Sequence, residues 1–417
     1  MIIPRKALKT SYDVYLVFVL TLSTGAFVTN FIGAEDADPD GSSVLKIVWG
    51  LVYIIAIGRL ISRRHEVARV IRRNRPIVLI ILLALTSPIW SIDPRRTLQT
   101  AGTLALTSLV ALDISLSYDL KRQLKAVCLV LVLVMALSVV VEVFLPGFVP
   151  GGVDQGDAWH GVFVAKNNFG RSICLYVTAF ITLYRQRWIR YVAVVSGVGL
   201  AALSQSVSAV VYIALMVMIV TSWSILKWKA TLRAIAMIGI SVMGSIAMGY
   251  TLLNLARVTP MVGKDPHLSK RVDLWELSID AVGKSPVLGY GFVAFWNSDS
   301  QPAARIREEL HWQVPHAHNG YIDILLGLGL AGLTLYAIVY VTLTKRAYIF
   351  FMGGNESYRR WPLSFLATTI LYQFTESTIL NGNNLYFILF CCLAFSLTEG
   401  EQKLQVAQVS PSSVLAA

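Results

Sequence analysis

Charged residues are scarce in this chain of 417 residues, because Lys, Arg, Asp and Glu together make up only 14% of it. Soluble globular proteins carry about 25% charged residues, so the chain lacks an ordinary water-exposed surface. Cysteine is also rare: the four cysteines lie inside apolar runs, and their spacing indicates neither a zinc site nor an external disulfide. Hydrophobic residues reach 55% and the mean hydropathy is +0.63. This composition predicts an integral membrane protein.

The apolar residues recur in blocks of about 17 to 25, the length that crosses a hydrocarbon core as a helix. We therefore expect an all-α polytopic protein with about twelve transmembrane helices. The predicted spans are 13–32, 44–61, 76–92, 98–116, 124–145, 168–184, 189–204, 207–226, 231–253, 319–344, 361–378 and 384–398. Charge patterning requires two spans rather than one within 189–226. One membrane domain is expected over 1–400, followed by a polar cytoplasmic tail without regular structure over 401–417.

Basic residues gather in alternate loops, and this pattern orients the chain because Lys and Arg are retained on the cytoplasmic side. Both termini are then predicted to be cytoplasmic. The loops between are external, including a long one over 254–318 that contains amphipathic helices between spans 9 and 10. The net charge of +12 follows from this topology, so no nucleic-acid partner is implied.

Histidine is distributed unevenly, because five of the six histidines fall in the predicted external segments. His316 and His318 stand directly before the tenth predicted span, where Asn319 is a candidate N-cap. The positive end of a helix dipole disfavours imidazolium, and a neutral imidazole can act as a general base near pH 7. The alternative is that both histidines serve only as cap and interface anchors.

A second group of external residues lies at 267–296. Val272, Trp275 and Ile279 share helical spacing, which predicts an amphipathic helix on the external membrane surface. Lys270 and Arg271 begin this helix. They can reach lipid phosphates, or they can bind a diphosphate on a substrate, for which the guanidinium group offers a fixed pair of donors.

External basic residues beside span ends are a minority under the positive-inside rule, so several together indicate an anionic ligand on that face. A shell of anionic lipid headgroups is the alternative. The residues concerned are Lys166, Arg171, Arg95 and Arg96.

Three motifs in this order resemble the O-antigen ligase and polymerase superfamily: "WHGVFVAKNNFG" (159–170), "RVDLWELSIDAVGKSPVLGYGF" (271–292) and "HAHNGYIDILLGLGLAGL" (316–333). The Lys-Asn-Asn-Phe-Gly form of the first motif is similar to bacterial exopolysaccharide polymerases of rhizobial succinoglycan type. The resemblance extends from about residue 80 to 395.

The resemblance implies a glycosyltransferase of the bacterial inner membrane whose active site faces the periplasm. Its donor and acceptor would be glycans on undecaprenyl diphosphate, with the bilayer, a chain-length regulator and export proteins as further partners. It implies no cofactor and no metal. The family's essential histidine maps to His318 or His316, of which we favour His318, and a family arginine maps to Arg271. A further family arginine has no counterpart, because Val207 stands at that position. Either Lys166, Arg171 or an arginine of "DPRR" replaces it, or this branch binds its diphosphate differently.

The predicted reaction is displacement at an anomeric carbon by a sugar hydroxyl, with inversion. His318 would be the base, and Arg271 with Lys166 and Arg171 would bind the diphosphate. The candidate sugar-binding residues are Trp159, Asn167, Trp275, Asn319 and Asp323. Two alternatives remain: an O-antigen ligase that transfers the glycan to lipid A core, and a transporter or flippase of lipid-linked oligosaccharides, which would show midplane charges and internal repeats.

Overall fold

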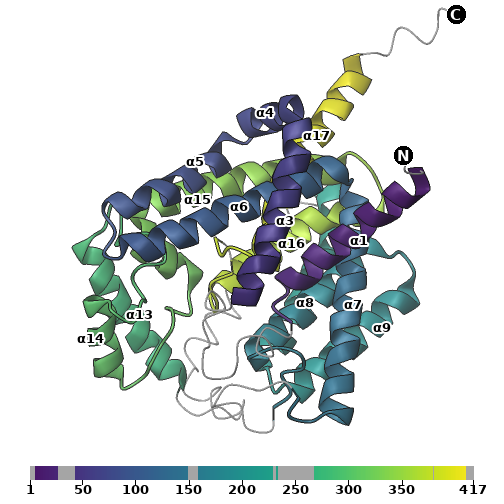
Figure 1. The fold of residues 1–417 in the computed structure, drawn as a ribbon. Helices are drawn as coiled ribbons and strands as arrows, with labels where there is room; N and C mark the ends of the chain where they lie inside the picture. The colour runs from purple at the N-terminus through teal and green to yellow at the C-terminus, as the bar shows by residue number, and fades with distance from the viewer. Residues whose placement is uncertain are drawn as a thin grey trace, which may run out of the picture.

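The computed structural model describes residues 5–26, 43–148, 158–228, 232, 267–378 and 380–409. All regular structure in these ranges is helical (Figure 1). The first half contains α1 (Arg5–Ser23), α3 (Ser43–Ser62), α4 (Arg64–Arg73), α5 (Arg75–Thr86), η1 (Ser87–Ile89), α6 (Pro94–Ser117), α7 (Leu120–Phe144), α8 (Lys166–Leu183) and α9 (Arg187–Leu203). The second half contains α10 (Val207–Ser222), η2 (Trp223–Lys227), α13 (His267–Lys284), α14 (Gln301–Leu310), α15 (Gly320–Met352), η3 (Ser357–Arg360), α16 (Trp361–Gln373) and α17 (Leu385–Val409).

These helices confirm an all-α membrane fold. Five segments of the described residues are long and apolar enough to cross a membrane: Ser43–Ser62, Pro94–Ser117, Leu120–Phe144, Ser208–Lys227 and Gly320–Met352. Shorter apolar helices cover Asp13–Ser23, Arg75–Ile89 and Leu385–Thr398. The predicted division within 189–226 is present, because α9 ends at Leu203 and α10 begins at Val207. The predicted span 231–253 lies outside the described residues.

Large apolar side chains on the outside of α3 and α9 are exposed, including Ile54 at 68% and Tyr191 at 71%. In water such a surface would be unfavourable, whereas a lipid-facing helix needs it. Between these faces, α8 packs against α7, α9, α10 and α16, and α6 packs against α3, α5 and α17. The helices that carry the candidate site are therefore held from several sides.

Helix α15 is broken at Gly329, where φ is +61° and ψ is −161°. The segment after α13 occupies the break: Leu330 N donates to Pro286 O at 2.8 Å, and Tyr290 N donates to Leu326 O at 2.7 Å. Backbone groups released by a broken helix in a membrane protein need such partners. These hydrogen bonds attach the segment that follows α13 to the first part of α15.

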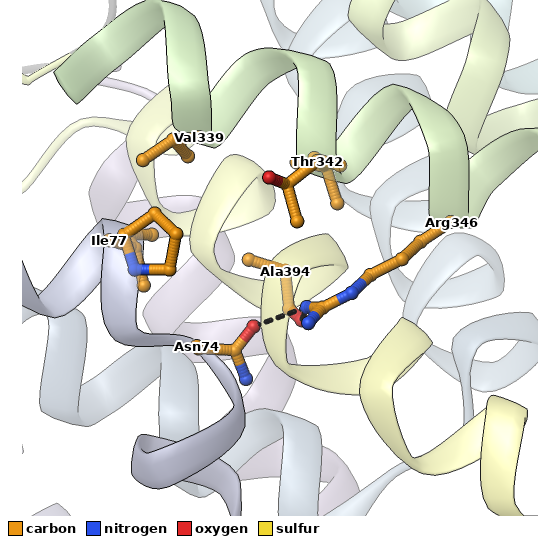
Figure 2. A pocket seen from close by; sticks show the side chains of 8 residues that line it. Asn74, Ile77, Val339, Thr342, Arg346 and Ala394 are labelled. Carbon is orange, nitrogen blue, oxygen red and sulfur yellow. Dashed lines mark hydrogen bonds between the residues drawn. The ribbon is translucent and has the colours of Figure 1, made fainter. Parts of the chain in front are cut away.

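The other end of α15 is fastened by Arg346, which lines a small cavity among α5, α15 and α17 (Figure 2). Its guanidinium donates to Asn74 Oδ1 at 2.6 Å and to Thr398 Oγ1 at 3.0 Å. At 1.5 Å per helical residue, this cavity is more than about 30 Å along α15 from its N-terminus. It lies away from the candidate site.

Asp113 lies near the C-terminal end of α6 and is fully buried. It pairs with Arg59, whose Nε lies 3.1 Å from Asp113 Oδ1. The sequence position of a residue along a helix does not say which neighbouring helix covers it, and here α3 covers α6.

Helix α17 continues past residue 400 to Val409, into the segment expected to lack regular structure. The residues "EQKLQVAQ" are mostly good helix formers, so they can extend a helix that has already been nucleated. Residues 410–417 lie outside the described ranges.

The segment that contains α13 and α14 has, together with the start of α15, a hydrophobic core of its own. Leu274 and Ala281 of α13, Ile306 of α14 and Ile322 of α15 are buried in it. Figure 1 shows α13 and α14 standing side by side at one flank of the molecule. The predicted amphipathic helix is present as α13; it buries Leu274 and leaves Val272 50% exposed. The core positions this helix against the start of α15.

Candidate functional site

The segment before α15 holds the two histidines in a fixed geometry. Asn319 caps the helix, because its Oδ1 accepts from Tyr321 N at 3.0 Å and Ile322 N at 3.3 Å. His318 adopts a left-handed backbone conformation with φ of +49°, and its ring stacks on Trp312 at a centroid distance of 5.6 Å and an interplanar angle of 9°. The predicted cap is therefore confirmed. The left-handed turn at His318, directly before the cap residue, sets the position of the two imidazole rings.

Asp323, on the first turn of α15, holds the segment before α15 in place through hydrogen bonds. Its Oδ1 accepts from Ala317 N at 3.1 Å and from Trp296 Nε1 at 2.8 Å, and its Oδ2 accepts from Ser377. Trp275 Nε1 of α13 donates to the carbonyl of Ala317 at 2.9 Å. The polar atoms of Asp323 and Trp275 are thus used to hold the loop.

Glu376, which follows α16, faces both histidines. His316 Nε2 lies 3.7 Å from its Oε2, and His318 Nδ1 lies 3.6 Å from its Oε1. Asn167 Nδ2, from the start of α8, donates to Oε1 at 3.2 Å. Residues from three distant parts of the sequence therefore meet at one carboxylate. We call His316, His318 and Glu376 the histidine–glutamate site.

The ionisation of this site follows from its surroundings. Burial lowers the pKa of His316, and the neighbouring His318 lowers it further, so His316 is neutral at pH 7. Burial by itself would raise the pKa of Glu376, but His318 and His316, once protonated at low pH, and the charge of Arg171 lower it to about 2. The site therefore contains an ionised carboxylate beside a neutral imidazole.

Arg171 lies close to this site, and Arg271 lies close to the neighbouring Tyr212. Arg171 of α8 acts electrostatically on both Glu376 and His316. Arg271 of α13 acts on Tyr212, which is also within range of Glu376 and whose hydroxyl contacts Thr375 at 3.0 Å. Among the residues that the structure describes, neither guanidinium forms an ion pair with a carboxylate.

The structure bears on the missing arginine near Val207. The turn before α10 packs directly against α8, since a Cβ on Gly170 would lie 2.9 Å from Ser206 Oγ and 3.2 Å from Ala209 Cβ. Arg171 follows Gly170, and its guanidinium lies over the ring of Tyr386. Of the replacements considered from the sequence, Arg171 is thus the one placed beside both this turn and Glu376.

The other predicted basic residues occupy different positions. Lys166 begins α8 immediately before Asn167. Arg95 and Arg96 begin α6, where the cap residue Asp93 accepts from Arg96 N at 3.0 Å. The side chain of Lys270 lies outside the described residues. Trp159 is joined through its backbone N–H to Leu203 O at 3.2 Å, beside the turn between α9 and α10.

The histidine–glutamate site also has the composition of a metal site, because its ligand atoms lie within 4.8 Å of one another. Two imidazoles and a carboxylate suit zinc. However, His316 Nδ1 accepts the backbone N–H of His318 at 3.0 Å, so the proton of the neutral ring is on Nε2. A metal at Nε2 would have to displace this proton and break that hydrogen bond.

Glu376 belongs to none of the motifs that point to the site in the sequence. Its position relative to His318 depends on how α16 packs against α15. The one available signal was that Glu376 stands at the end of an apolar block on the same predicted face as the histidines.

Comparison with known proteins adds two findings. Residues 191–337 match the O-antigen ligase family, a range that includes α13, Arg271, His316 and His318. The chain is also 28% identical over 198 residues to the exopolysaccharide production protein ExoQ of Rhizobium meliloti (strain 1021), covering 44% of this chain and 45% of that protein. The matched part is thus less than half of that relative. The two similarities confirm the resemblance to the O-antigen ligase and polymerase superfamily, in its rhizobial exopolysaccharide branch.

Proposed function

We propose that this relative of O-antigen ligases and polymerases is a membrane glycosyltransferase that joins oligosaccharide repeat units carried on undecaprenyl diphosphate into exopolysaccharide. The observation that carries this proposal is the meeting of a histidine pair with Glu376 beside the start of α15, with Arg171 of α8 close to them. Transfer from a sugar diphosphate requires a base for the attacking hydroxyl and positive charge for the leaving diphosphate.

In the proposed reaction, a hydroxyl of the acceptor glycan attacks the anomeric carbon of the donor glycan. The new glycosidic C–O bond forms as the bond to the diphosphate breaks, and undecaprenyl diphosphate leaves with the electron pair. His318 takes the proton of the attacking hydroxyl. A single displacement inverts the anomeric centre, and the diphosphate needs no general acid because it is already a good leaving group.

Arg271 and Arg171 would bind the diphosphate, with Lys166 and Lys270 as further cations at the same face. Arg95 and Arg96 would attract the anionic substrate from the edge of the membrane. For the sugars, we propose contacts with Asn167 and with the ring faces of Trp159 and Trp275, while Asn319 and Asp323 support the loop that bears the base.

The proposed location is the bacterial inner membrane, with both termini in the cytoplasm and the histidine–glutamate site facing the periplasm. The lipid carrier would then stay in the bilayer while the glycan remains in water. A chain-length regulator and export proteins are the further partners that such a polymer requires. The reaction as written uses no metal and no cofactor.

The experiment is complementation of a deletion strain with wild type, His318→Ala or Arg271→Ala, at membrane levels matched by immunoblot. We expect both variants to lose high-mass secreted polysaccharide and to accumulate single lipid-linked repeat units. Normal polymer in the uncomplemented deletion strain would refute the polymerase proposal. Normal polymer from both variants would refute the site.

O-antigen ligation is the second candidate, because the matched family is described as O-antigen ligase. The chemistry at the anomeric carbon is the same and only the acceptor differs. Lipopolysaccharide from the same deletion strain separates the two functions: a ligase predicts loss of glycan from lipid A core, with secreted polymer unchanged.

A further inference from the structure

The histidine–glutamate site contains one carboxylate and two imidazoles, and each imidazole directs one nitrogen at a different oxygen of that carboxylate. His316 Nε2 faces Oε2 at 3.7 Å, and His318 Nδ1 faces Oε1 at 3.6 Å. Both distances are slightly longer than hydrogen bonds, and a shift of a few tenths of an ångström on substrate binding would close them. The two rings contact each other with centroids 4.1 Å apart.

The two histidines differ in the nitrogen that remains for chemistry. The Nδ1 of His316 accepts the backbone N–H of His318, so its proton is on Nε2 and points toward Glu376. Both nitrogens of His316 are therefore engaged. An ionised carboxylate only accepts hydrogen bonds, so it favours the tautomer of His318 with the proton on Nδ1. In that tautomer the lone pair is on Nε2.

We propose that Glu376 is a positioning residue, which selects the Nδ1–H tautomer of His318 so that its Nε2 is the base and His316 is not. This inference rests on the proposed function. Within the described part of the chain no hydrogen bond joins His318 Nε2 to a protein group, so Nε2 can approach an acceptor hydroxyl. In the reaction the hydroxyl proton moves to Nε2, and Glu376 stabilises the imidazolium that forms.

Glu376 is itself held in place. Asn167 donates to its Oε1 at 3.2 Å, and its backbone N–H donates to Tyr372 O at 2.8 Å. Asn167 belongs to the Lys-Asn-Asn-Phe-Gly motif, so that motif reaches the base through the carboxylate. Because the pKa of Glu376 is about 2, the carboxylate stays charged at every pH at which the enzyme could work.

Other charged groups also face this site from the surrounding elements. At His316, Arg171 of α8 contributes positive charge and Asp323 of α15 contributes negative charge, and Arg271 of α13 acts on the nearby Tyr212. Arg171 opposes protonation of His316. The imidazolium formed on His318 in the reaction is stabilised by the carboxylate of Glu376, which lies 3.6 Å from Nδ1. Removing this carboxylate should therefore affect the rate more than the binding of the donor.

The test uses the purified full-length protein in nanodiscs and lipid-linked oligosaccharide extracted from the deletion strain. The variants are Glu376→Gln, Glu376→Asp and His316→Gln, and polymer formation is followed from pH 5 to pH 9. The matched control is Glu142→Gln. Glu142 is another acid of this face whose Oε1 accepts from His160 N and Gly161 N, and the amide oxygen of glutamine can still accept both.

We expect Glu376→Gln to lower kcat by about 10²- to 10⁴-fold, the usual contribution of a general base, with KM changed less than threefold. The acid limb of its pH profile should move to lower pH, because without the anion an imidazolium is less stable. Glu376→Asp should recover part of the rate. His316→Gln should keep more than about a tenth of it, and Glu142→Gln should match wild type.

A kcat for Glu376→Gln within threefold of wild type, or an acid limb that does not move, would overturn the role of Glu376. A greater loss in His316→Gln than in His318→Gln would overturn the choice of base. Glu376→Asp separates positioning from misfolding, since it retains the charge. These outcomes differ from failure of the proposed function, in which the deletion strain accumulates no lipid-linked oligosaccharide and wild type forms no polymer.

Discussion

Replacement of Gly329 by alanine should detach the segment 286–291 from α15. The φ of +61° and ψ of −161° at Gly329 belong to a region that only glycine occupies readily. A Cβ there would lie 2.3 Å from both the carbonyl carbon and the carbonyl oxygen of Val287. These are backbone atoms, so no side-chain rotation can relieve the contact.

The cost can be worked from the contacts around the break. The backbone conformation alone costs about 1–3 kcal/mol for a residue with a side chain. Moving the 286–291 segment away would break four backbone hydrogen bonds: Leu330 N to Pro286 O, Ala331 N to Val287 O, Tyr290 N to Leu326 O and Gly291 N to Gly327 O. At about 0.5–1.5 kcal/mol each, these bring the total to about 3–9 kcal/mol.

The assay is thermal unfolding of the purified protein in detergent, together with polymer formation in the deletion strain. Gly102→Ala in α6 is the matched control, because nothing lies within 4 Å of a Cβ at that position. Gly329→Ala should lower the unfolding midpoint by several degrees and reduce polymer, since α13 carries Arg271. Gly102→Ala should do neither. Equal midpoints and equal polymer from the two variants would refute the assigned role of the break.

Three further predictions concern charge. Arg171→Ala should lower kcat/KM for the lipid-linked donor by about 10²- to 10³-fold in nanodiscs, with Arg171→Lys intermediate; rates equal to wild type would contradict the clamp. Asp113→Ala should cost about 1–3 kcal/mol because it removes the carboxylate that pairs with the partly buried Arg59, which keeps its hydrogen bond to Ser117, whereas Arg59→Met with Asp113→Leu should cost less; equal unfolding midpoints for the two proteins would contradict this. Finally, stability should fall on acidification. Folding lowers the pKa values of His316 and Glu376, so each residue takes up its proton at a higher pH in the unfolded chain than in the folded one. His316 therefore favours unfolding as the pH falls below 6.5, and Glu376 does so between about pH 4.5 and 2. In scanning fluorimetry, the unfolding midpoint of His316→Gln should decline less between pH 7 and 5 than that of wild type. Identical slopes for the two proteins would contradict this prediction.

The sequence predicted much of the fold because span length and the positions of basic loops are local properties. Eleven of the predicted spans coincide with described helices, and the turn between α9 and α10 falls where charge patterning required it. The cap at Asn319 was also predictable, since an asparagine before an apolar run has a specific role at a helix start. The extension of α17 past residue 400 was missed, because polar composition alone does not prevent a helix from continuing.

The candidate site was predictable only in part. His316, His318 and Arg271 could be singled out because external histidines and arginines beside spans are unusual. Their spatial relation to Arg171 could not be predicted, since it depends on how α8 packs against α10 and α16. For the same reason the sequence offered four replacements for the missing arginine at Val207, and the packing of Gly170 on Ser206 favours one of them.

By itself, the sequence determined that the chain is a bundle of apolar helices with a histidine pair at the start of one of them, because hydropathy and capping act over a few neighbouring residues. Only the tertiary structure decided that Glu376 faces those histidines, that Asp113 is buried against Arg59, and that α15 opens at Gly329 to admit the 286–291 segment. Each of these contacts joins residues far apart in sequence. They form where the surfaces of packed helices are complementary, and that information is not contained in any one segment.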